Sequence, residues 1–282
     1  MQLQYLGNIS GGQDGAIYEN FLFRLDARGN CLVHDLDSGD ISVPIGAFSL
    51  DQRDWIIPHS NAVVFGTSRY APEDPFPLLY TNVYNNHAKD PDPRKGTCCV
   101  YRIQREQEGF AASLVQLIRI GFTEDPKLWH SSEARADVRP YGNFVIDRDL
   151  DTLWAFTMRD ADATTRYFAF SLPEVGSGSP GERGIPTVVL NESDIRAQFD
   201  CPYHHFIQGA CAHRGRIYSV EGFTGSEKNP PALRVISCLE EKQLQYIPFA
   251  RFGLEEEPEF IDFRGEICYY SDHLGNFYRV DL

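Results

Sequence analysis

Residues 205–219 have the sequence His-Phe-Ile-Gln-Gly-Ala-Cys-Ala-His-Arg-Gly-Arg-Ile-Tyr-Ser, within the longer stretch 203–249. The Arg-Gly pair at 214–215 separates two apolar segments, a pattern typical of two strands joined by a tight turn. Two more strand-like segments follow at residues 233–239 and 244–249. The stretch 203–249 therefore predicts one complete unit of four antiparallel strands.

The same unit recurs along the whole chain. The second strand of the unit, at residues 217–218, has counterparts at 22–23, 79–80 and 153–154, and the turn 215–217 has one at 265–267. A repeated four-stranded unit is typical of a β-propeller, in which each unit forms one blade. The chain contains 19 Phe and 14 Tyr but only 2 Met, which favours strands over helices.

The two ends of the chain complete one blade together. Five units fill the chain, at about 11–50, 56–121, 137–190, 203–250 and 256–282, and the last has only three strands. Residues 2–6, Gln-Leu-Gln-Tyr-Leu, nearly repeat residues 243–247, Gln-Leu-Gln-Tyr-Ile, the fourth strand of the fourth unit. We therefore predict an all-β protein, residues 1–282 forming a single five-bladed β-propeller domain of four-stranded antiparallel blades.

In this arrangement the N-terminal strand, residues 1–7, completes the last blade and removes the exposed edge that an open array would leave. The alternative fold is a β-sandwich, which would not predict the shared strand sequence. In the third unit we expect the fourth strand at residues 187–190. A short helix at 191–199 would follow, capped by Asn191 or Ser193.

Several segments carry a resemblance to known propellers. They are residues 59–62 with 65–66, 73–80, 99–103, 208–209 with 217–218, and 257–259 before Gly265. The chain resembles five-bladed β-propellers, and in particular an uncharacterised propeller family of gut-type bacteria, over nearly its whole length. This resemblance implies the fold but no activity, because propellers include hydrolases, lyases, lectins and scaffolds.

Composition narrows the class of partner. The net charge of −14 disfavours nucleic acid and favours a neutral or cationic ligand. No apolar stretch is long enough to span a membrane, and residues 1–6 do not resemble a signal peptide. The seven cysteines, an odd number, are interpreted mainly as small buried residues in a reducing compartment, so we expect a cytoplasmic protein.

Polar residues begin the first strand of every unit, where a propeller has its central channel. They are Gln13, Asp14, Ser60, Asn61, Tyr141, Asn143, His205, Gln208, Glu257 and Glu259. Buried polar groups need partners, which here would be ordered water, an ion or a ligand. Five oxygen-rich side chains would suit calcium, although no metal site follows from spacing: Gln13, Asp14, Asn61, Asn143 and Glu259.

Histidines extend this candidate site. His59 and His205 precede first strands, and His87 lies in a long loop, 85–97, expected at the same mouth of the channel. An imidazole can act as a general base or bind a sugar hydroxyl. His205 could pair with Glu257 as a base with its orienting carboxylate. Asp14 could contribute to the carboxylate pair of a glycoside hydrolase.

We expect a ligand-binding propeller that recognises a small polar molecule, carbohydrate first, at this mouth. The expected ligand-binding residues are Gln13, His59, Asn61, His87, Tyr141, Asn143, Gln208 and Glu259. One alternative is a glycan-active hydrolase or lyase with His205, Glu257 and Asp14 as catalytic residues. The other is a protein-interaction scaffold with a hydrated channel.

Overall fold

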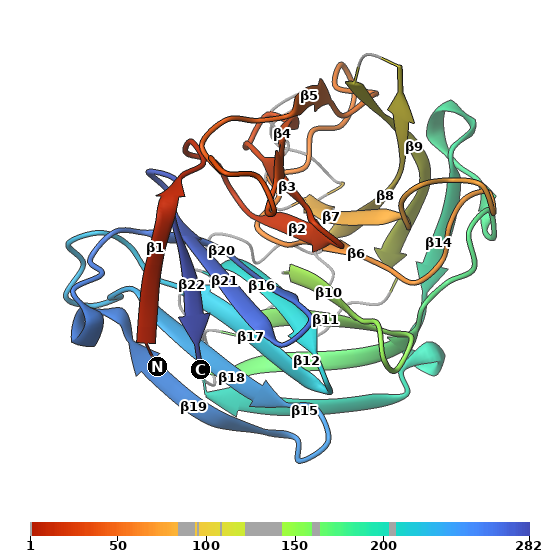
Figure 1. The fold of residues 1–282 in the computed structure, drawn as a ribbon. Coiled ribbons are helices and arrows are strands. Elements are labelled where there is room, and N and C mark those ends of the chain that lie inside the picture. The colour runs from red at the N-terminus through yellow and green to blue at the C-terminus, as the bar shows by residue number, and fades with distance from the viewer. Residues whose placement is uncertain are drawn as a thin grey trace.

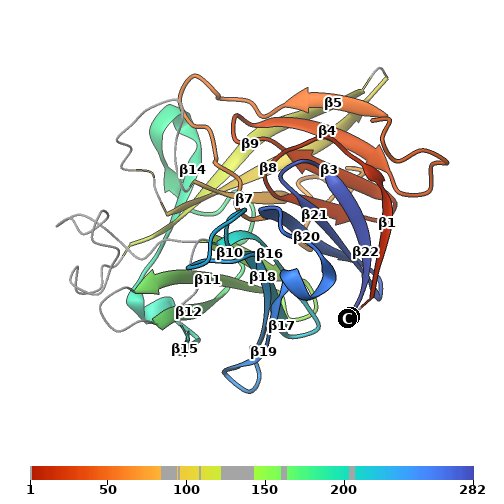
Figure 2. The same ribbon diagram turned by 90° about the vertical axis from the view of Figure 1, so that its left-hand side faces the viewer.

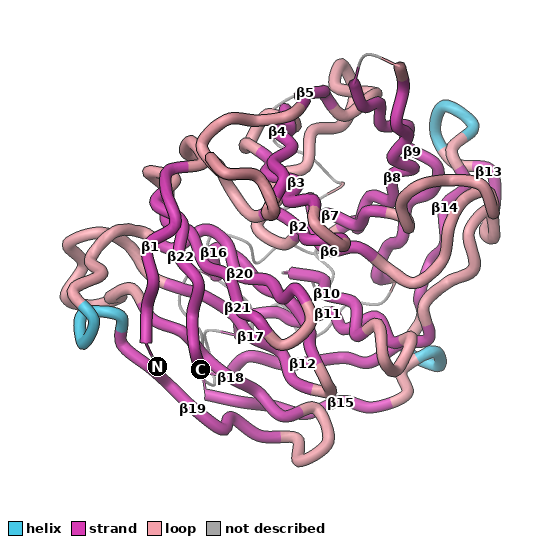
Figure 3. Tube along the Cα trace, in the orientation of Figure 1, coloured by secondary structure: helices cyan, strands magenta, loops and turns pink. Residues whose placement is uncertain are grey.

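The computed structural model describes residues 2–83, 94, 96–107, 109–121, 143–159, 164–202 and 207–282, without the side chains of residues 143, 158 and 159. The described residues form five small sheets placed around a common axis (Figures 1 and 2). Strands and loops dominate, and the helical elements are single short turns (Figure 3). No helix in this part of the chain is long and apolar enough to cross a membrane.

Each sheet is one blade, and its strands follow one another from the channel outward. Blade 1 contains β2 (Gly15–Tyr18), β3 (Phe21–Leu25), β4 (Asn30–Asp35) and β5 (Gly46–Ser49). Blade 2 contains β6 (Val63–Phe65), β7 (Leu79–Val83), β8 (Thr97–Glu106) and β9 (Gly109–Ile120). Blade 3 contains β10 (Asn143–Asp147), β11 (Thr152–Arg159), β12 (Thr164–Ser171) and β15 (Ala197–Pro202).

Blade 4 contains β16 (Ile207–His213), β17 (Arg216–Glu221), β18 (Ala232–Ser237) and β19 (Lys242–Pro248). Blade 5 contains β20 (Pro258–Arg264), β21 (Ile267–Asp272), β22 (Asn276–Asp281) and β1 (Gln2–Asn8). All pairings within the five blades are antiparallel. The predicted five-bladed propeller is therefore confirmed.

The N-terminal strand closes the ring. β1 pairs with β22, placing Leu3 opposite Val280 and Tyr5 opposite Tyr278. The rings of Tyr5 and Tyr278 meet edge to face, with their centroids 5.4 Å apart. Figure 1 shows the two ends of the chain side by side on this blade. The closure predicted from the repeated Gln-Leu-Gln-Tyr sequence is thus confirmed.

The hydrophobic core lies between neighbouring blades. Between blades 1 and 2, Phe23 packs edge-on against Phe65 and Phe76, with ring centroids 5.1 Å apart in both pairs. All three rings are buried. Aromatic pairs of this kind contribute about 0.5–1.5 kcal/mol each beyond the area that they bury. The seven cysteines are all buried free thiols in these apolar clusters or beside them.

The chain between β12 and β15 departs from the predicted order. The expected fourth strand of blade 3, at residues 187–190, is wrong: β14 (Pro186–Leu190) instead pairs in parallel with β9 of blade 2. β13 (Ser179–Pro180) pairs with β14, so the sheet of blade 2 has six strands. The sequence Thr-Val-Val-Leu favours a strand, but β9 offers it an open edge and apolar neighbours such as Ile118 and Ile120.

The predicted helix at 191–199 is also wrong. Only Glu192–Asp194 forms a single 3-10 turn, capped by Asn191 as expected. Residues 197–199 belong to β15, the actual fourth strand of blade 3, which pairs with β12. The alternating burial of β15 explains this outcome, since Phe199 and Cys201 pack against blade 3 while the residues beside them are exposed or half-buried.

Two arginines hold the segment between β12 and β15 in place, one through the linker between blades 1 and 2 and one through the loop before β8. Arg183 makes a two-pronged ion pair with Asp54, at 2.9 and 2.7 Å, and Arg94 donates to Glu182 at 2.6 Å. Both guanidinium groups also lie over the indole of Trp55, 5.3 and 4.9 Å from its centroid. The segment that contains β13 and β14 is therefore tied to blade 2 and to the linker that precedes it.

Candidate functional site at the mouth of the central channel

The five first strands surround the channel in the order β2, β6, β10, β16 and β20, and β20 contacts β2 again. β16 also approaches β6 across the ring, so the channel is narrow. Each first strand is the inner edge of its sheet. Half of its backbone N–H and C=O groups therefore find no partner within the blade, and channel side chains must satisfy them.

Asp14 meets this need at the start of β2. Its Oδ2 accepts the backbone N–H of Val63 in blade 2 at 3.0 Å and that of Ala210 in blade 4 at 3.3 Å. Its own N–H donates to the carbonyl of Ser60 at 3.0 Å. The side chain is completely buried. Asp14 therefore joins blade 1 to blades 2 and 4 across the channel.

Asp262 has a similar role further along the channel. Its Oδ2 accepts the N–H of Ile17, from β2, at 2.7 Å, and its Oδ1 accepts the N–H of Phe263 at 2.8 Å. Arg148 of blade 3 lies 3.7 Å from Oδ1. Through backbone hydrogen bonds, the two buried carboxylates thus connect the inner edges of blades 1, 2, 4 and 5.

Two β-bulges direct polar side chains into the mouth. The pairing of β16 with β17 shifts between Ile207 and Gly209, and that of β20 with β21 shifts between Pro258 and Phe260. The extra residues are Gln208 and Glu259. A bulge turns its unpaired residue away from the regular alternation, which is how strands next to binding sites commonly present a side chain.

Gly209 lies where blades 1, 4 and 5 approach one another closely. A Cβ at this position would lie 2.6 Å from the carbonyl oxygen of Glu259 and 3.2 Å from Oδ1 of Asp14. No side chain fits there without moving the backbone of blade 5. Gly209 is therefore required by the close approach of three blades.

A chain of hydrogen bonds crosses the mouth from blade 2 to blade 5. Nδ2 of Asn61 donates to Oε1 of Gln208 at 3.2 Å and to the carbonyl of Ile207 at 3.4 Å. Nε2 of Gln208 in turn donates to Oε1 of Glu257. The backbone N–H of Glu257 donates to Oγ1 of Thr224, in the loop between β17 and β18, at 2.8 Å. Glu257 is half-buried and is held in one orientation.

A buried charged group completes the mouth. Arg24 is 2% exposed, and its Nη2 donates to the carbonyls of Gly12 and Asp272 at 3.2 and 3.4 Å. Oε1 of Glu259 accepts from Nε2 of Gln13 at 3.4 Å. In the described part of the chain, five buried atoms of these four residues have no hydrogen-bond partner: Oε1 of Gln13, Oδ1 of Asp14, Nε and Nη1 of Arg24, and Oε2 of Glu259.

No ion pair joins Arg24 to Asp14 or Glu259 in the described part of the chain. The three charges nevertheless act on one another: burial lowers the pKa of Arg24, and the carboxylates of Glu259 and Asp14 partly oppose this shift. Buried polar atoms without a protein partner are commonly satisfied by ordered water or by a ligand.

Burial also changes the carboxyl groups of the site. Complete burial raises the pKa of Asp14 well above its ordinary value, although three backbone N–H groups and Arg24 oppose this shift. Burial likewise raises the pKa of Glu259, against Arg24, and that of Glu257, against His273 and Gln208. Carboxyl groups in this environment keep a proton to higher pH than exposed ones.

The structure thus brings together six of the predicted residues at one mouth: Gln13, Asp14, Asn61, Gln208, Glu257 and Glu259. His59 is half-buried in the segment before β6. His87, Tyr141 and His205 lie outside the described residues, as does the side chain of Asn143, whose backbone begins β10. The roles predicted for these four stay predictions.

The predicted calcium site finds little support. No group of three or more His, Cys, Asp or Glu side chains that could hold a metal ion occurs among the described residues. Arg24 already provides a positive charge close to Asp14 and Glu259, which disfavours a second cation between them. Calcium therefore stays a prediction.

Arg24 is a site residue that the sequence analysis missed. It lies in the apolar strand Phe-Leu-Phe-Arg-Leu of β3, at a position that the repeat alignment gives to Ser219 in blade 4 and Thr81 in blade 2. The other two blades have Ala155 and Tyr269 there, so a charge among uncharged counterparts was the signal that could have identified it. The two bulges have no comparable signal, because they depend on how neighbouring strands pair.

Comparisons with known proteins support the fold. No family model and no curated protein matches the sequence, so the resemblance to a gut-type bacterial family stays a prediction. Glutaminyl cyclase from Myxococcus xanthus superposes with a TM-score of 0.51 at 10% identity, over 100% of this chain and 96% of that one. A computationally designed protein, Ika8, gives a TM-score of 0.38 at 9% identity, over 99% and 100% of the two chains.

At 10% identity the likeness to the cyclase concerns the fold and not the activity. It extends over the whole chain, in agreement with the five sheets and their closure. The chain is a five-bladed β-propeller whose last blade is completed by its own N-terminal strand.

Proposed function

We propose that this propeller binds a small polar ligand at the mouth of its central channel, and that the ligand is a carbohydrate. One observation carries the proposal. Within the described residues, Asp14, Arg24 and Glu259 each hold at least one buried polar atom without a hydrogen-bond partner. Leaving such atoms unpaired is costly, so an occupant stabilises the site.

The chemistry of these atoms supports a ligand rich in hydroxyl groups. Arg24 offers two donors, while Asp14 and Glu259 offer acceptors. A hydroxyl group both donates and accepts, so neighbouring hydroxyls of a sugar match this mixed set. Glu257, oriented by Gln208 and only half-buried, would be the first carboxylate that an incoming ligand meets.

An enzyme is the second candidate, and Glu257 is the observation that favours it. A half-buried carboxyl group with a raised pKa at a channel mouth is suited to general acid or base catalysis. The structural neighbour from Myxococcus xanthus is named as a glutaminyl cyclase, which adds a glutaminyl compound to the substrates worth testing. His205 would be the partner of Glu257 in this case.

The geometry argues against a glycosidase that uses Asp14. Its Oδ2 accepts two hydrogen bonds from backbone N–H groups of other blades, which suits a structural carboxylate. Glu257 is therefore the carboxyl group on which a catalytic reading depends. A scaffold with a hydrated channel would leave the same atoms bound to water alone.

Thermal unfolding in the presence of candidate ligands tests the proposal. The panel contains neutral mono- and disaccharides, calcium chloride and a short glutaminyl peptide. A ligand at about 100 times its Kd adds about 2.7 kcal/mol to stability. For a domain of this size that is a rise of about 5 °C or more in Tm. We expect such a rise with at least one saccharide.

Two matched variants test whether the rise in Tm comes from ligand binding at the channel mouth. Glu257→Gln removes the charge at the mouth, and we expect it to weaken binding about tenfold, which is about 1.4 kcal/mol. Glu255→Gln changes an exposed carboxylate two residues away and should leave the shift unchanged. If the wild type changes the mass of a candidate ligand over time and Glu257→Gln does not, the enzyme is favoured over the binding protein. If nothing in the panel raises Tm, the scaffold replaces our proposal.

A further inference from the structure

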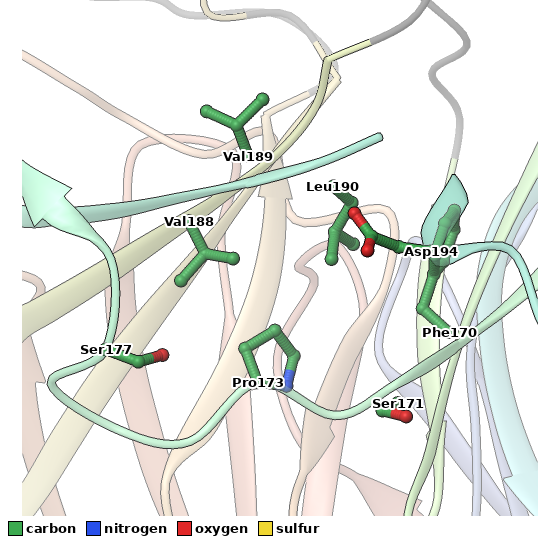
Figure 4. A pocket seen from close by; sticks show the side chains of 8 residues that line it. All are labelled: Phe170, Ser171, Pro173, Ser177, Val188, Val189, Leu190 and Asp194. Atoms are coloured by element: carbon green, nitrogen blue, oxygen red, sulfur yellow. The ribbon is translucent and has the colours of Figure 1, made fainter. Parts of the chain in front are cut away.

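A second concave site lies away from the channel, between the outer parts of blades 2 and 3. It is an open groove of about 510 Å³, within the range typical of small-molecule sites (Figure 4). Its walls come from Val188 and Leu190 on β14 and from Phe170 and Pro173 at the end of β12 and after it. The groove therefore exists because β14 crosses to blade 2.

The walls of this groove are firm and combine polar and apolar surface in about equal parts. Phe170 and Leu190 are buried in the cluster that joins blades 2 and 3, with 0% and 6% exposure. Val189 lies at the rim and is 47% exposed. Gln116, buried on β9, donates to the carbonyl of Ser177 at 3.0 Å and so holds the loop that forms one side. The groove is thus a surface of mixed polarity supported by the core.

Asp194 is the charged side chain among the residues that line the groove. Its Oδ2 accepts the N–H of Asn191 at 2.7 Å, and this capping interaction holds the carboxylate on a 3-10 turn. Within the described residues, Oδ1 accepts no hydrogen bond and no ion pair neutralises the group. In Figure 4 the carboxylate points toward the space beside Leu190.

Charged residues other than Asp194 also lie near the groove. Arg196 donates from Nη1 to Oγ of Ser171, another lining residue, at 3.4 Å, but forms no ion pair with Asp194 in the described part of the chain. Glu192 lies on the same turn as Asp194 and is exposed. The whole chain carries a net charge of −14. An overall negative field concentrates cations near the surface.

We propose that this groove binds a small organic cation with an apolar body, such as an arylalkyl or branched alkyl ammonium. The ammonium group pairs with Asp194, and the body packs on Val188, Val189 and Pro173. Charge complementarity selects the cation over a neutral molecule of the same shape. This site is independent of the channel mouth and of any ligand there.

Titration with benzylammonium and with benzyl alcohol, followed by protein NMR, tests the proposal. The two probes share an aromatic ring and differ in charge. A charge-assisted hydrogen bond is roughly twice as strong as a neutral one. We expect saturable shifts of residues that line the groove, and a Kd about 5–10 times lower for benzylammonium.

Two neighbouring variants make the test specific. Asp194→Asn keeps an oxygen that can cap Asn191 but removes the charge, so we expect the two probes to bind equally. Glu192→Gln removes a charge from the same turn outside the groove and should preserve the difference. A third variant, Val188→Lys, places a cation in the groove and should abolish benzylammonium binding while thermal unfolding shows a folded protein.

Three results would overturn the proposal. The probes could bind wild type with equal Kd, or the shifts could fall on residues away from the groove. Glu192→Gln could also reduce the preference as much as Asp194→Asn, which would mean that the general negative charge of the surface attracts the cation.

Discussion

Replacing Asp14 with Ala tests how the blades are held together. The substitution removes the acceptor of two buried backbone N–H groups, those of Val63 and Ala210. Each buried donor left without a partner costs about 1–3 kcal/mol, so the loss is about 2–6 kcal/mol. Asp14→Asn retains an oxygen that can accept both groups, and we expect it to lose less than half as much.

The loss of stability caused by Asp14→Ala should decrease as pH rises. Because burial raises the pKa of Asp14 above its usual value of about 3.9, the folded protein retains a proton that the unfolded chain releases. Between these two pKa values, the free energy of unfolding of the wild type falls as pH rises. Asp14→Ala lacks this group, so the difference between the two proteins is largest below the unfolded pKa of about 3.9 and shrinks as pH rises toward the folded pKa.

Urea unfolding of the wild type, Asp14→Ala and Asp14→Asn between pH 4.5 and 8 measures both quantities. Equal slopes of the free energy against urea would show that the unfolded states are comparable. A loss below about 0.5 kcal/mol in Asp14→Ala at pH 4.5 would refute the role of Asp14 as a link between blades. A loss that grows with pH would refute the effect of burial on its pKa.

Two further predictions follow from the packing of the blades. Gly209→Ala places a Cβ 2.6 Å from a backbone oxygen, so we expect a loss of about 1–3 kcal/mol and weaker ligand binding at the mouth, while Gly109→Ala, with open space around it, should cost much less in the same urea assay. Deleting residues 1–8 removes β1 and exposes the edge of β22, so we expect a lower Tm and a concentration-dependent increase in size on gel filtration. A monomeric deletion variant as stable as the wild type would show that closure by β1 is dispensable.

The repeat in the sequence was enough to predict the fold. Aligning Gln208 with Gln13, and Gly209 with both Asp14 and Glu259, identified channel positions before any strand pairing was known. The shared Gln-Leu-Gln-Tyr sequence predicted the closure of the ring. These predictions succeeded because equivalent positions in the blades pack in the same way and therefore carry similar residues.

Features that depend on long-range pairing could not be predicted in this way. Residues 187–190 have the composition of a strand, but nothing local indicates that they pair in parallel with β9 of another blade. The bulges at Gln208 and Glu259, which direct both side chains into the mouth, arise from register shifts between strands. Arg24 was missed because a charged residue in a buried strand is explained only by the carboxylates that surround it.

An experimental structure of the channel mouth, at a resolution that shows ordered water, tests the central claim most directly. Crystals would be grown with the saccharide that gives the largest thermal shift. We expect non-protein density between Oδ1 of Asp14, Nη1 of Arg24 and Oε2 of Glu259, with the saccharide reaching Glu257. Direct contact of the Arg24 guanidinium with both carboxylates, and no density between them, would contradict it.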